Sequence, residues 1–260
     1  MTHESLANAW DSGRAALGGW VTGGGDFTVA ILRRAGYDYV AIDCQHTTMD
    51  EATVATILQR TPPSGPATIV RVSKNDPALI GRLVDAGADG VIVPMVSIPE
   101  EAEAAVAAVR YPPAGVRSCG PMRPDLLVDD LRVLEDRVSI FVMIETALGL
   151  DNVEKIAAVP GLAGIYVGPA DLSIGLGLSP RGAFTSDQLV EPLQRIRYAC
   201  QAASIIFGMH QMSAETAVKW ISRGVQMASL STDAGMLMST AMTYRDDTLR
   251  GIQPVPRMRG

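Results

Sequence analysis

The feature that most constrains the fold is a short apolar, β-branched segment that recurs about every 20 to 35 residues, each time followed by a helical pattern. The expected strands are residues 15–21, 39–44, 67–72, 90–95, 138–145, 162–168, 204–210 and 225–231. Strands that are apolar throughout and alternate with helices are typical of a parallel sheet covered on both faces. Eight such units in 260 residues predict a (β/α)8 barrel.

The segments between the strands support this α/β interpretation. Amphipathic helices are expected at 26–36, 77–87, 99–110 and 213–224, and several end in glycine, as helices often do. A doubly wound open sheet is the alternative, but the glycines at 23–25 lack the G-x-G-x-x-G spacing of a dinucleotide-binding turn. No linker-like stretch divides the chain, so we expect a single domain over residues 1–260, with a structured loop at 111–131.

Composition excludes several classes of function. The net charge is −6 and the pI is near 5.1, which argues against a non-specific nucleic-acid binder. We find neither a secretory signal pattern at the start nor a run of about 18 apolar residues, so we expect no membrane association. Cys44, Cys119 and Cys200 are odd in number and far apart, which favours a reducing, cytoplasmic setting with each cysteine as a small buried hydrophobe.

Polar residues gather at the carboxyl ends of the expected strands, where a parallel barrel carries its active site. They are Asp43, Gln45, His46, Arg71, Glu145, Asp171, His210, Gln211, Ser231 and Asp233. Each has a structural alternative: Glu145 or Asp171 as a helix cap, Arg71 as an ion-pair partner, or a histidine satisfied within a loop. Their convergence on one rim favours a common site.

The chemistry that these groups suit is narrow. Two carboxylates and water form an oxygen-rich site for Mg²⁺ or Mn²⁺, although a third protein ligand is not evident. Arg71 offers a fork for a carboxylate, so a chelated 2-oxo acid would become acidic at its methyl group, and His46 is the natural base. Lys74 is in a loop beyond its strand, which makes a Schiff-base aldolase the weaker interpretation.

Several motifs resemble the HpcH/HpaI aldolases, which are class II, metal-dependent pyruvate aldolases with a barrel of the phosphoenolpyruvate/pyruvate superfamily type. The similarity covers about residues 15–245. It is carried by "YDYVAIDCQHTTMD", "IVRV", "LVDAGADGVIVPMV", "VRYPPAGVRS", "GVQMASLSTDAGML" and, most specifically, "IETALGLDNVEKIAAVPGLAGIYVGPADLSIGLG".

The resemblance implies roles for individual residues. Glu145 and Asp171 would bind the divalent cation, which would be Mg²⁺, Mn²⁺ or Co²⁺. Arg71 would grip the pyruvate carboxylate, and the backbone N–H groups of Ala170 and Asp171 would help to hold it.

The resemblance also implies an acid/base pair and an assembly. His46 would be the acid/base, oriented by Asp85. The family is usually a hexamer, a trimer of dimers with swapped C-terminal helices, so residues 236–252 are a candidate exchanged element. An ordinary closing helix is the alternative, and the tail at 250–260 is expected to fray or to pack on a partner subunit.

Three departures from the family pattern bear on activity. Gln45 stands where many members have glutamate, and Met143 stands where members often carry glutamine. The loop "CGPMRPDLL" at 119–127 differs as well, and Arg123 in it is a candidate replacement for a family arginine.

The resulting hypothesis is reversible retro-aldol cleavage of a 4-hydroxy-2-oxo acid to pyruvate and an aldehyde, through a metal-stabilised pyruvate enolate. A related barrel lyase that acts on a β-hydroxyacyl-CoA or decarboxylates oxaloacetate is one alternative. A non-catalytic keto-acid-binding paralogue is the other.

Overall fold

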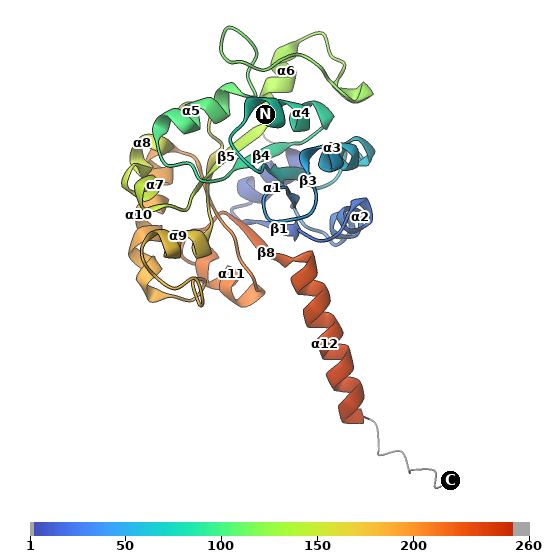
Figure 1. Cartoon of the computed structure of the whole chain (residues 1–260), viewed down its shortest axis with the longest axis vertical. Helices are drawn as coiled ribbons and strands as arrows, with labels where there is room; N and C mark the ends of the chain where they lie inside the picture. Colours follow the sequence, from blue (N-terminus) through green and yellow to red (C-terminus); the bar gives the residue numbers. More distant parts are fainter. Residues whose placement is uncertain (1–2, 252–260) are drawn as a thin grey trace, which may run out of the picture.

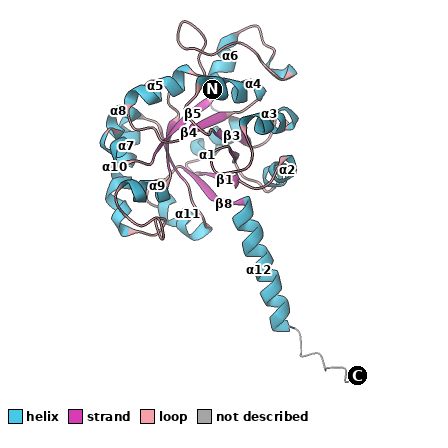
Figure 2. Ribbon diagram, viewed as in Figure 1, coloured by secondary structure: helices cyan, strands magenta, loops and turns pink. Residues whose placement is uncertain are grey.

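The computed structural model describes residues 3–251 and contains a closed barrel of eight parallel strands in the order β1 to β8, with β8 pairing back onto β1 (Figures 1 and 2). The strands are β1 Ala16–Val21, β2 Tyr39–Asp43, β3 Ala67–Arg71, β4 Gly90–Val93, β5 Ser139–Ile144, β6 Gly164–Val167, β7 Ile206–Met209 and β8 Met227–Thr232. This confirms the predicted (β/α)8 barrel, and the open doubly wound sheet is wrong.

Helices surround the barrel (Figure 2). They are α1 Glu4–Asp11, α2 Asp26–Arg34, α3 Glu51–Arg60, α4 Pro77–Ala86, α5 Pro99–Ala107, α6 Leu131–Asp136, α7 Ala147–Asp151, α8 Val153–Ala157, α9 Pro169–Gly175, α10 Val190–Ala203, α11 Ala214–Ile221 and α12 Asp233–Gly251, with 3-10 turns η1 Pro124–Leu126 and η2 Asp187–Leu189. Local sequence sets their ends: Asp76 caps α4, and Gly87 ends it in a left-handed conformation with φ 115°.

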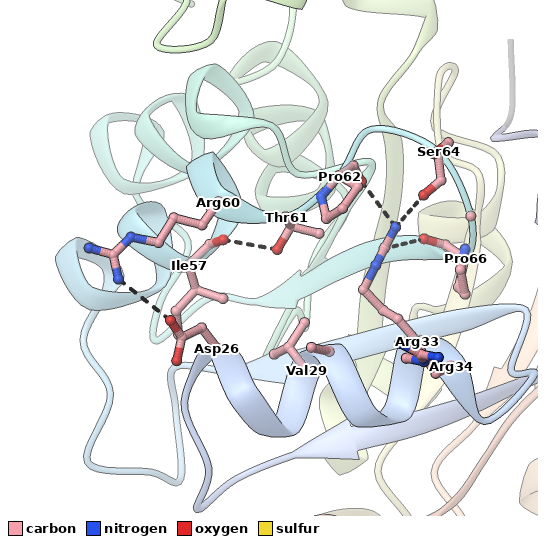
Figure 3. Close-up of a pocket in the computed structure, with 12 residues that line it drawn as sticks. Asp26, Val29, Arg33, Arg34, Ile57, Arg60, Thr61, Pro62, Ser64 and Pro66 are labelled. Atoms are coloured by element: carbon pink, nitrogen blue, oxygen red, sulfur yellow. Dashed lines mark hydrogen bonds and ion pairs between the residues drawn. The ribbon is translucent and has the colours of Figure 1, made fainter.

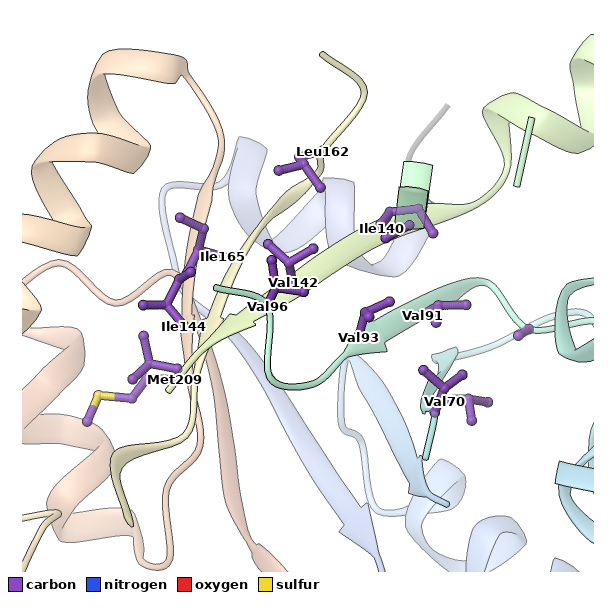
Figure 4. Packing of buried hydrophobic residues seen from close by; sticks show 14 of the residues in the cluster. Val70, Val91, Val93, Val96, Ile140, Val142, Ile144, Leu162, Ile165 and Met209 are labelled. Atoms are coloured by element: carbon purple, nitrogen blue, oxygen red, sulfur yellow. The ribbon is translucent and has the colours of Figure 1, made fainter. Parts of the chain in front are cut away.

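Alternate residues of each strand contribute to two separate cores. Outward-facing side chains such as Val91, Val142 and Ile165 pack under the helices in the larger core (Figure 4). Inward-facing side chains such as Trp20, Tyr39 and Tyr166 fill the barrel interior. The strands are therefore buried on both faces, which explains their continuous apolar sequence.

Two glycines make room for the interior aromatic rings. A Cβ at Gly18 would lie 2.1 Å from the Tyr39 ring, and one at Gly208 would lie 2.6 Å from the Tyr166 ring. Helix α1 contributes the buried residues Leu6 and Ala9 to the same interior core. Because α1 precedes β1 and packs on β1 and β3, it closes the end of the barrel opposite the carboxyl ends of the strands.

The segment at 111–131 has structure of its own, as predicted. It contains η1, and Tyr111 and Leu126 form a small core with Leu134 of α6. Cys44 and Cys200 are buried as expected, but Cys119 in this segment is exposed, so the expectation of a buried thiol is wrong there.

Helix α12 extends away from the barrel, and none of its residues is buried (Figure 1). Its exposed apolar side chains include Leu237, Met238 and Met242. The predicted fraying or packing of the tail concerns mainly residues 252–260, which lie outside the described residues. Within residues 3–251, no helix has the length and apolar character needed to cross a membrane.

Candidate active site

Four polar residues face the barrel axis at the carboxyl ends of their strands. Asp43 and Glu145 are two positions beyond the inward-facing Ala41 and Met143, so strand alternation turns them inward. Arg71 follows Ile69 and His210 follows Gly208 in the same way. Residues distant in sequence therefore meet at one mouth, where barrel enzymes carry their active sites.

Asp43 and Arg71 form a buried ion pair on the β2–β3 side of this mouth. Arg71 Nε donates to Asp43 Oδ1 at 2.9 Å, and Arg71 Nη2 donates to Asp43 Oδ2. Trp20 Nε1 lies 3.4 Å from Asp43 Oδ2, and the guanidinium carbon of Arg71 is 5.2 Å from the Trp20 ring centroid. Burial raises the pKa of Asp43, but the hydrogen bonds and charge of Arg71 outweigh it, so the net pKa lies below its ordinary value.

The same aspartate holds the loop that carries His46. Asp43 Oδ1 accepts the backbone N–H of Gln45 at 2.9 Å and, more weakly, that of His46 at 3.4 Å. Thr47 Oγ1 donates to the carbonyl of Thr22 at 2.6 Å. His46 itself is exposed, so its imidazole is available to a bound molecule.

Glu145 at the end of β5 is buried but incompletely paired. Its Oε1 accepts the backbone N–H of Met95 at 2.8 Å, whereas Oε2 has no partner among the described residues. The pKa of Glu145 is raised to about 7, chiefly by burial and to a lesser extent by the nearby charge of Asp171, while the Met95 hydrogen bond and the charge of Arg71 oppose the shift. A buried carboxylate with so few partners would be stabilised in its ionised form by a bound cation.

Asp171 is in the first turn of α9, which starts at Pro169 directly after β6. The N-cap of that helix is Gly168, so the capping alternative for Asp171 does not apply. A Cβ at Gly168 would lie 2.5 Å from Glu145 Oε2, and only glycine leaves this oxygen its space. The sequence "GPAD" thus brings a second carboxylate beside Glu145.

The pair of Glu145 and Asp171 fits a hard divalent cation. The orphaned oxygen of Glu145 and the neighbouring carboxylate supply the oxygen ligands that Mg²⁺ and Mn²⁺ prefer. Within residues 3–251, no group of three or more His, Cys, Asp or Glu side chains could hold a metal. Water and substrate would therefore complete the coordination.

Asp85 does not meet His46 within the described part of the chain. Its Oδ1 accepts from Arg117 Nη2 at 2.7 Å, and Arg117 is itself buried with Nε and Nη1 unpartnered. Asp85 lies at the end of α4, which runs from the carboxyl end of β3 back to the start of β4. The chain therefore places the aspartate towards the opposite end of the barrel.

The predicted polar residues at the ends of β7 and β8 differ in their positions and partners. His210 lies beside Trp20, with ring centroids 4.7 Å apart. Gln211 is fully buried, and its amide has no partner among the described residues. Ser231 has a positive φ of 113° and donates its N–H to the Gln211 carbonyl. The carboxylate of Asp233 is occupied by the loop after β1, since it accepts from the N–H groups of residues 22–24 and from Thr22 Oγ1.

Three other cations pair with groups of the fold. Lys74, in the loop after β3, pairs with Asp76 at 3.3 Å, and its side chain is exposed. Arg123 bonds Asp125 and the carbonyl of Leu58, so its side chain does not lie at the mouth of its own chain.

The third is Arg33, in a pocket of about 380 Å³ between α2 and α3 (Figure 3). Its guanidinium donates to the carbonyls of Pro62, Ser64 and Pro66, so it ties the loop before β3 to α2. The charge of Arg33 is committed to the fold.

Sequence reasoning missed three contributors to the mouth. Met95 has a left-handed backbone, with φ 61°, and this conformation accompanies the hydrogen bond to Glu145. Nothing in the sequence marks that residue. Trp20 is an aromatic residue inside an expected strand, and Gly168 is the glycine of "GPAD". Neither pattern indicates which side chain at the mouth the residue contacts.

A closed parallel barrel with an arginine and a pair of carboxylates at its mouth has the architecture of a barrel enzyme. The chain belongs to the HpcH/HpaI aldolase/citrate lyase family, whose model matches residues 17–240. A hydroxypyruvate/pyruvate aldolase of Rhizorhabdus wittichii is 35% identical over 238 residues, which cover 91% of this chain and 95% of the relative.

Two further proteins are similar over nearly the whole chain. A 4-hydroxy-2-oxo-heptane-1,7-dioate aldolase of Klebsiella pneumoniae is 33% identical and covers 90% of each chain. The crystal structure of an HpcH/HpaI aldolase/citrate lyase family protein from Burkholderia cenocepacia superposes with a TM-score of 0.85 at 27% identity, covering 95% of this chain and 99% of that one. These similarities confirm the family that the motifs indicated.

Proposed function

We propose that the protein is a class II pyruvate aldolase that cleaves a 4-hydroxy-2-oxo acid reversibly to pyruvate and an aldehyde. The observation that carries the proposal is the buried, half-paired Glu145 at the end of β5, two strands along the mouth from Arg71 of β3. Family membership and aldolase relatives over nine tenths of the chain make it a carbon–carbon lyase.

Arg71 binds the carboxylate of the 2-oxo acid in this proposal. Asp43 holds one edge of the guanidinium, which fixes its plane and leaves its remaining N–H donors for a ligand. The backbone N–H groups of Ala170 and Asp171, in the first turn of α9, add donors for the same carboxylate.

Glu145 and Asp171 hold the divalent cation, which is Mg²⁺, Mn²⁺ or Co²⁺. A bound cation supplies Lewis acidity that makes the C3 hydrogens of a chelated 2-oxo acid more acidic. The burial of Glu145 excludes water from one side of the site and strengthens its attraction for positive charge.

His46 transfers the protons. In the cleavage direction its imidazole takes the proton of the 4-hydroxyl group as the C3–C4 bond breaks, so the C4–O group becomes the aldehyde carbonyl. The bonding pair remains on the pyruvate fragment as its enolate, and protonation at C3 then gives pyruvate. The exposure of His46 at the rim supports this role.

The proposed pairing of His46 with Asp85 requires a second copy of the chain, because α4 carries Asp85 away from the mouth that His46 borders. Mixing His46→Ala and Asp85→Ala chains tests this arrangement. Mixed assemblies should recover activity that neither variant has alone, and no recovery would contradict a pair formed between subunits.

A homo-oligomer, with a hexamer as the expectation, also suits α12. Its exposed Leu237, Met238 and Met242 need a covering surface, and an exchanged position on a neighbouring subunit provides one. We also propose that the chain is a single domain whose C-terminal helix is exchanged between subunits. The cytoplasmic location stays a prediction.

One observation favours an alternative to the aldolase, namely a barrel that binds keto acids without catalysis. Met143 is buried beside Gly168 and gives no polar contact to a keto acid, unlike the glutamine expected in the family. A lyase for CoA esters or an oxaloacetate decarboxylase is the other candidate. The pocket that combines Arg33, Arg34 and Arg60 lies between α2 and α3 and not at the mouth.

Exchange of the pyruvate methyl protons in D₂O, followed by proton NMR, tests the proposal without knowledge of the aldehyde. Exchange should occur with Mg²⁺, Mn²⁺ or Co²⁺, stop with chelator and be lost in His46→Ala. An absence of exchange with every cation would contradict the aldolase and favour the binding protein.

A further inference from the structure

His210 is a half-buried titratable group that the proposed chemistry does not use, although it faces the same mouth. β7 and β3 are four strands apart in an eight-stranded ring, so His210 and Arg71 lie on opposite sides of the axis. The Trp20 ring lies between them. Its centroid is 5.2 Å from the Arg71 guanidinium carbon and 4.7 Å from the His210 ring, which meets it edge-on at 74°.

The His210 ring is held through one nitrogen and keeps the other free. Its Nδ1 lies 3.0 Å from Ser229 Oγ, and Ser229 is fixed in turn by the Gln211 N–H, which donates to Oγ at 2.8 Å. Nε2 has no hydrogen bond to any described residue. A fixed ring with an unused polar atom is suited to bind a ligand group.

The imidazole is uncharged at neutral pH. Burial lowers the pKa of His210 to about 4, and the charge of Arg71 lowers it while that of Asp43 opposes. Trp20 and Phe184, whose ring centroid is 6.3 Å away, supply apolar neighbours. A neutral donor or acceptor in such surroundings matches a neutral hydroxyl group better than a carboxylate.

The rest of the rim shows which substrate His210 faces. Arg71 on β3 and the carboxylates after β5 and β6 serve the 2-oxo acid in the proposed function. On the β8–β1 side, the carboxylate of Asp233 is occupied by N–H groups of residues 22–24. Among the described residues facing inward at the strand ends, His210 is therefore a polar side chain that stays available to the second substrate, in addition to the proton-transferring His46 of the rim.

We propose that His210 determines acceptor specificity, with Nε2 hydrogen-bonding the hydroxyl group of a short 2-hydroxyaldehyde. This inference rests on the proposed aldolase function and adds the chemical class of its aldehyde. It assigns no proton transfer to His210.

The test compares glycolaldehyde with propanal as acceptors for pyruvate. The two aldehydes have the same number of heavy atoms, with a hydroxyl in one where the other has a methyl. The measured quantity is the ratio of their kcat/KM values, normalised to wild type, which cancels their difference in intrinsic reactivity. The variants are His210→Leu, His210→Asn and His210→Gln.

The variants separate the two ring nitrogens. Asparagine can keep the contact to Ser229 but has no atom at the Nε2 position, whereas the glutamine amide reaches one bond further, towards Nε2. The glycolaldehyde-to-propanal ratio should fall about tenfold in His210→Leu and His210→Asn, as expected for one lost hydrogen bond, and recover in His210→Gln.

A ratio that stays at the wild-type value in His210→Leu and His210→Asn overturns the specificity role, even if both rates fall. Pyruvate-methyl exchange on the wild-type enzyme separates this result from failure of the aldolase proposal. Exchange with an unchanged ratio rejects the role of His210 alone. An absence of exchange rejects the aldolase and the inference with it.

Discussion

Two parts of the barrel mouth each contain a buried carboxylate, and the two carboxylates differ in their partners and in the direction of their pKa shifts. Asp43 on the β2–β3 side accepts from the Arg71 guanidinium and from loop N–H groups, and its pKa is lowered. Glu145 on the β5 side has one N–H partner and one orphaned oxygen, and its pKa is raised to about 7. Both residues are almost fully buried, so burial does not explain the contrast.

The contrast separates a structural carboxylate from a ligand-binding one. Asp43 is complete within the chain and positions Arg71 and the His46 loop. Glu145 is incomplete, and Gly168 preserves the space beside its free oxygen. A chain that leaves a buried acceptor unsatisfied loses stability, and a divalent cation restores it.

The largest effect is expected at Glu145. Glu145→Gln keeps the shape but removes the charge that holds the cation, and aldol cleavage should fall by about 1,000-fold or more, the size of a lost Lewis acid. The assay is pyruvate release from a 4-hydroxy-2-oxo acid at saturating Mg²⁺. Glu103→Gln, at an exposed position of α5, is the matched control and should retain wild-type rates. Full activity in Glu145→Gln would contradict the assignment of Glu145 as the cation-binding carboxylate.

Arg71→Lys should have the next largest effect, because lysine cannot bond Asp43 and a carboxylate through one planar fork. We expect a fall of about 100-fold in kcat/KM, with a higher KM for pyruvate in the aldol direction. Arg33→Lys is the control, since Arg33 also donates to several acceptors but lies outside the mouth. Equal losses in the two variants would point to general destabilisation.

Asp233→Asn should have a moderate effect. The change removes a charge that accepts N–H groups of residues 22–24, and the Thr22 carbonyl in turn holds Thr47 beside His46. We expect about 1–2 kcal/mol less unfolding free energy and a several-fold lower kcat. Urea unfolding and the cleavage assay measure the two. Asp129→Asn, at an exposed position before α6, should alter neither, and a wild-type kcat in Asp233→Asn would contradict the link to the His46 loop.

The smallest effect concerns pH and tests the Asp43 side alone. Because the folded-state pKa of Asp43 lies below the ordinary value of 3.8, its ionised form stabilises the fold above pH 3.8. This stability is lost as the pH falls through the lower folded-state value. The unfolding free energy of wild type relative to Asp43→Asn should therefore shrink as the pH falls from 5 towards 2. A difference that stays constant over this range would contradict the lowered pKa.

The sequence was sufficient to predict the barrel because its signals are local and repeated. Each strand is apolar throughout, and Asp76 and Gly87 mark the ends of their helix. Placing Asp43, Arg71 and Glu145 at one mouth then required only the rule that parallel strands end on the same side.

The remaining features depend on tertiary geometry. The hydrogen bond from Met95 to Glu145 arises from a left-handed backbone that no residue type there requires. The capture of Asp233 by residues 22–24 joins parts of the chain that are far apart in sequence. Strand position suggested that Asp233 faces the mouth, and only the fold shows that its charge is used elsewhere.

The most direct test of the contrast is Mn²⁺ binding, measured by electron paramagnetic resonance on wild type, Glu145→Gln and Asp43→Asn. We predict that Glu145→Gln loses Mn²⁺ binding while Asp43→Asn keeps it. Of the two carboxylates, Glu145 is the one with an oxygen that has no hydrogen-bond partner among the described residues. Mn²⁺ binding that survives in Glu145→Gln, or that is lost only in Asp43→Asn, would contradict the division of the mouth into a structural side and a cation-binding side.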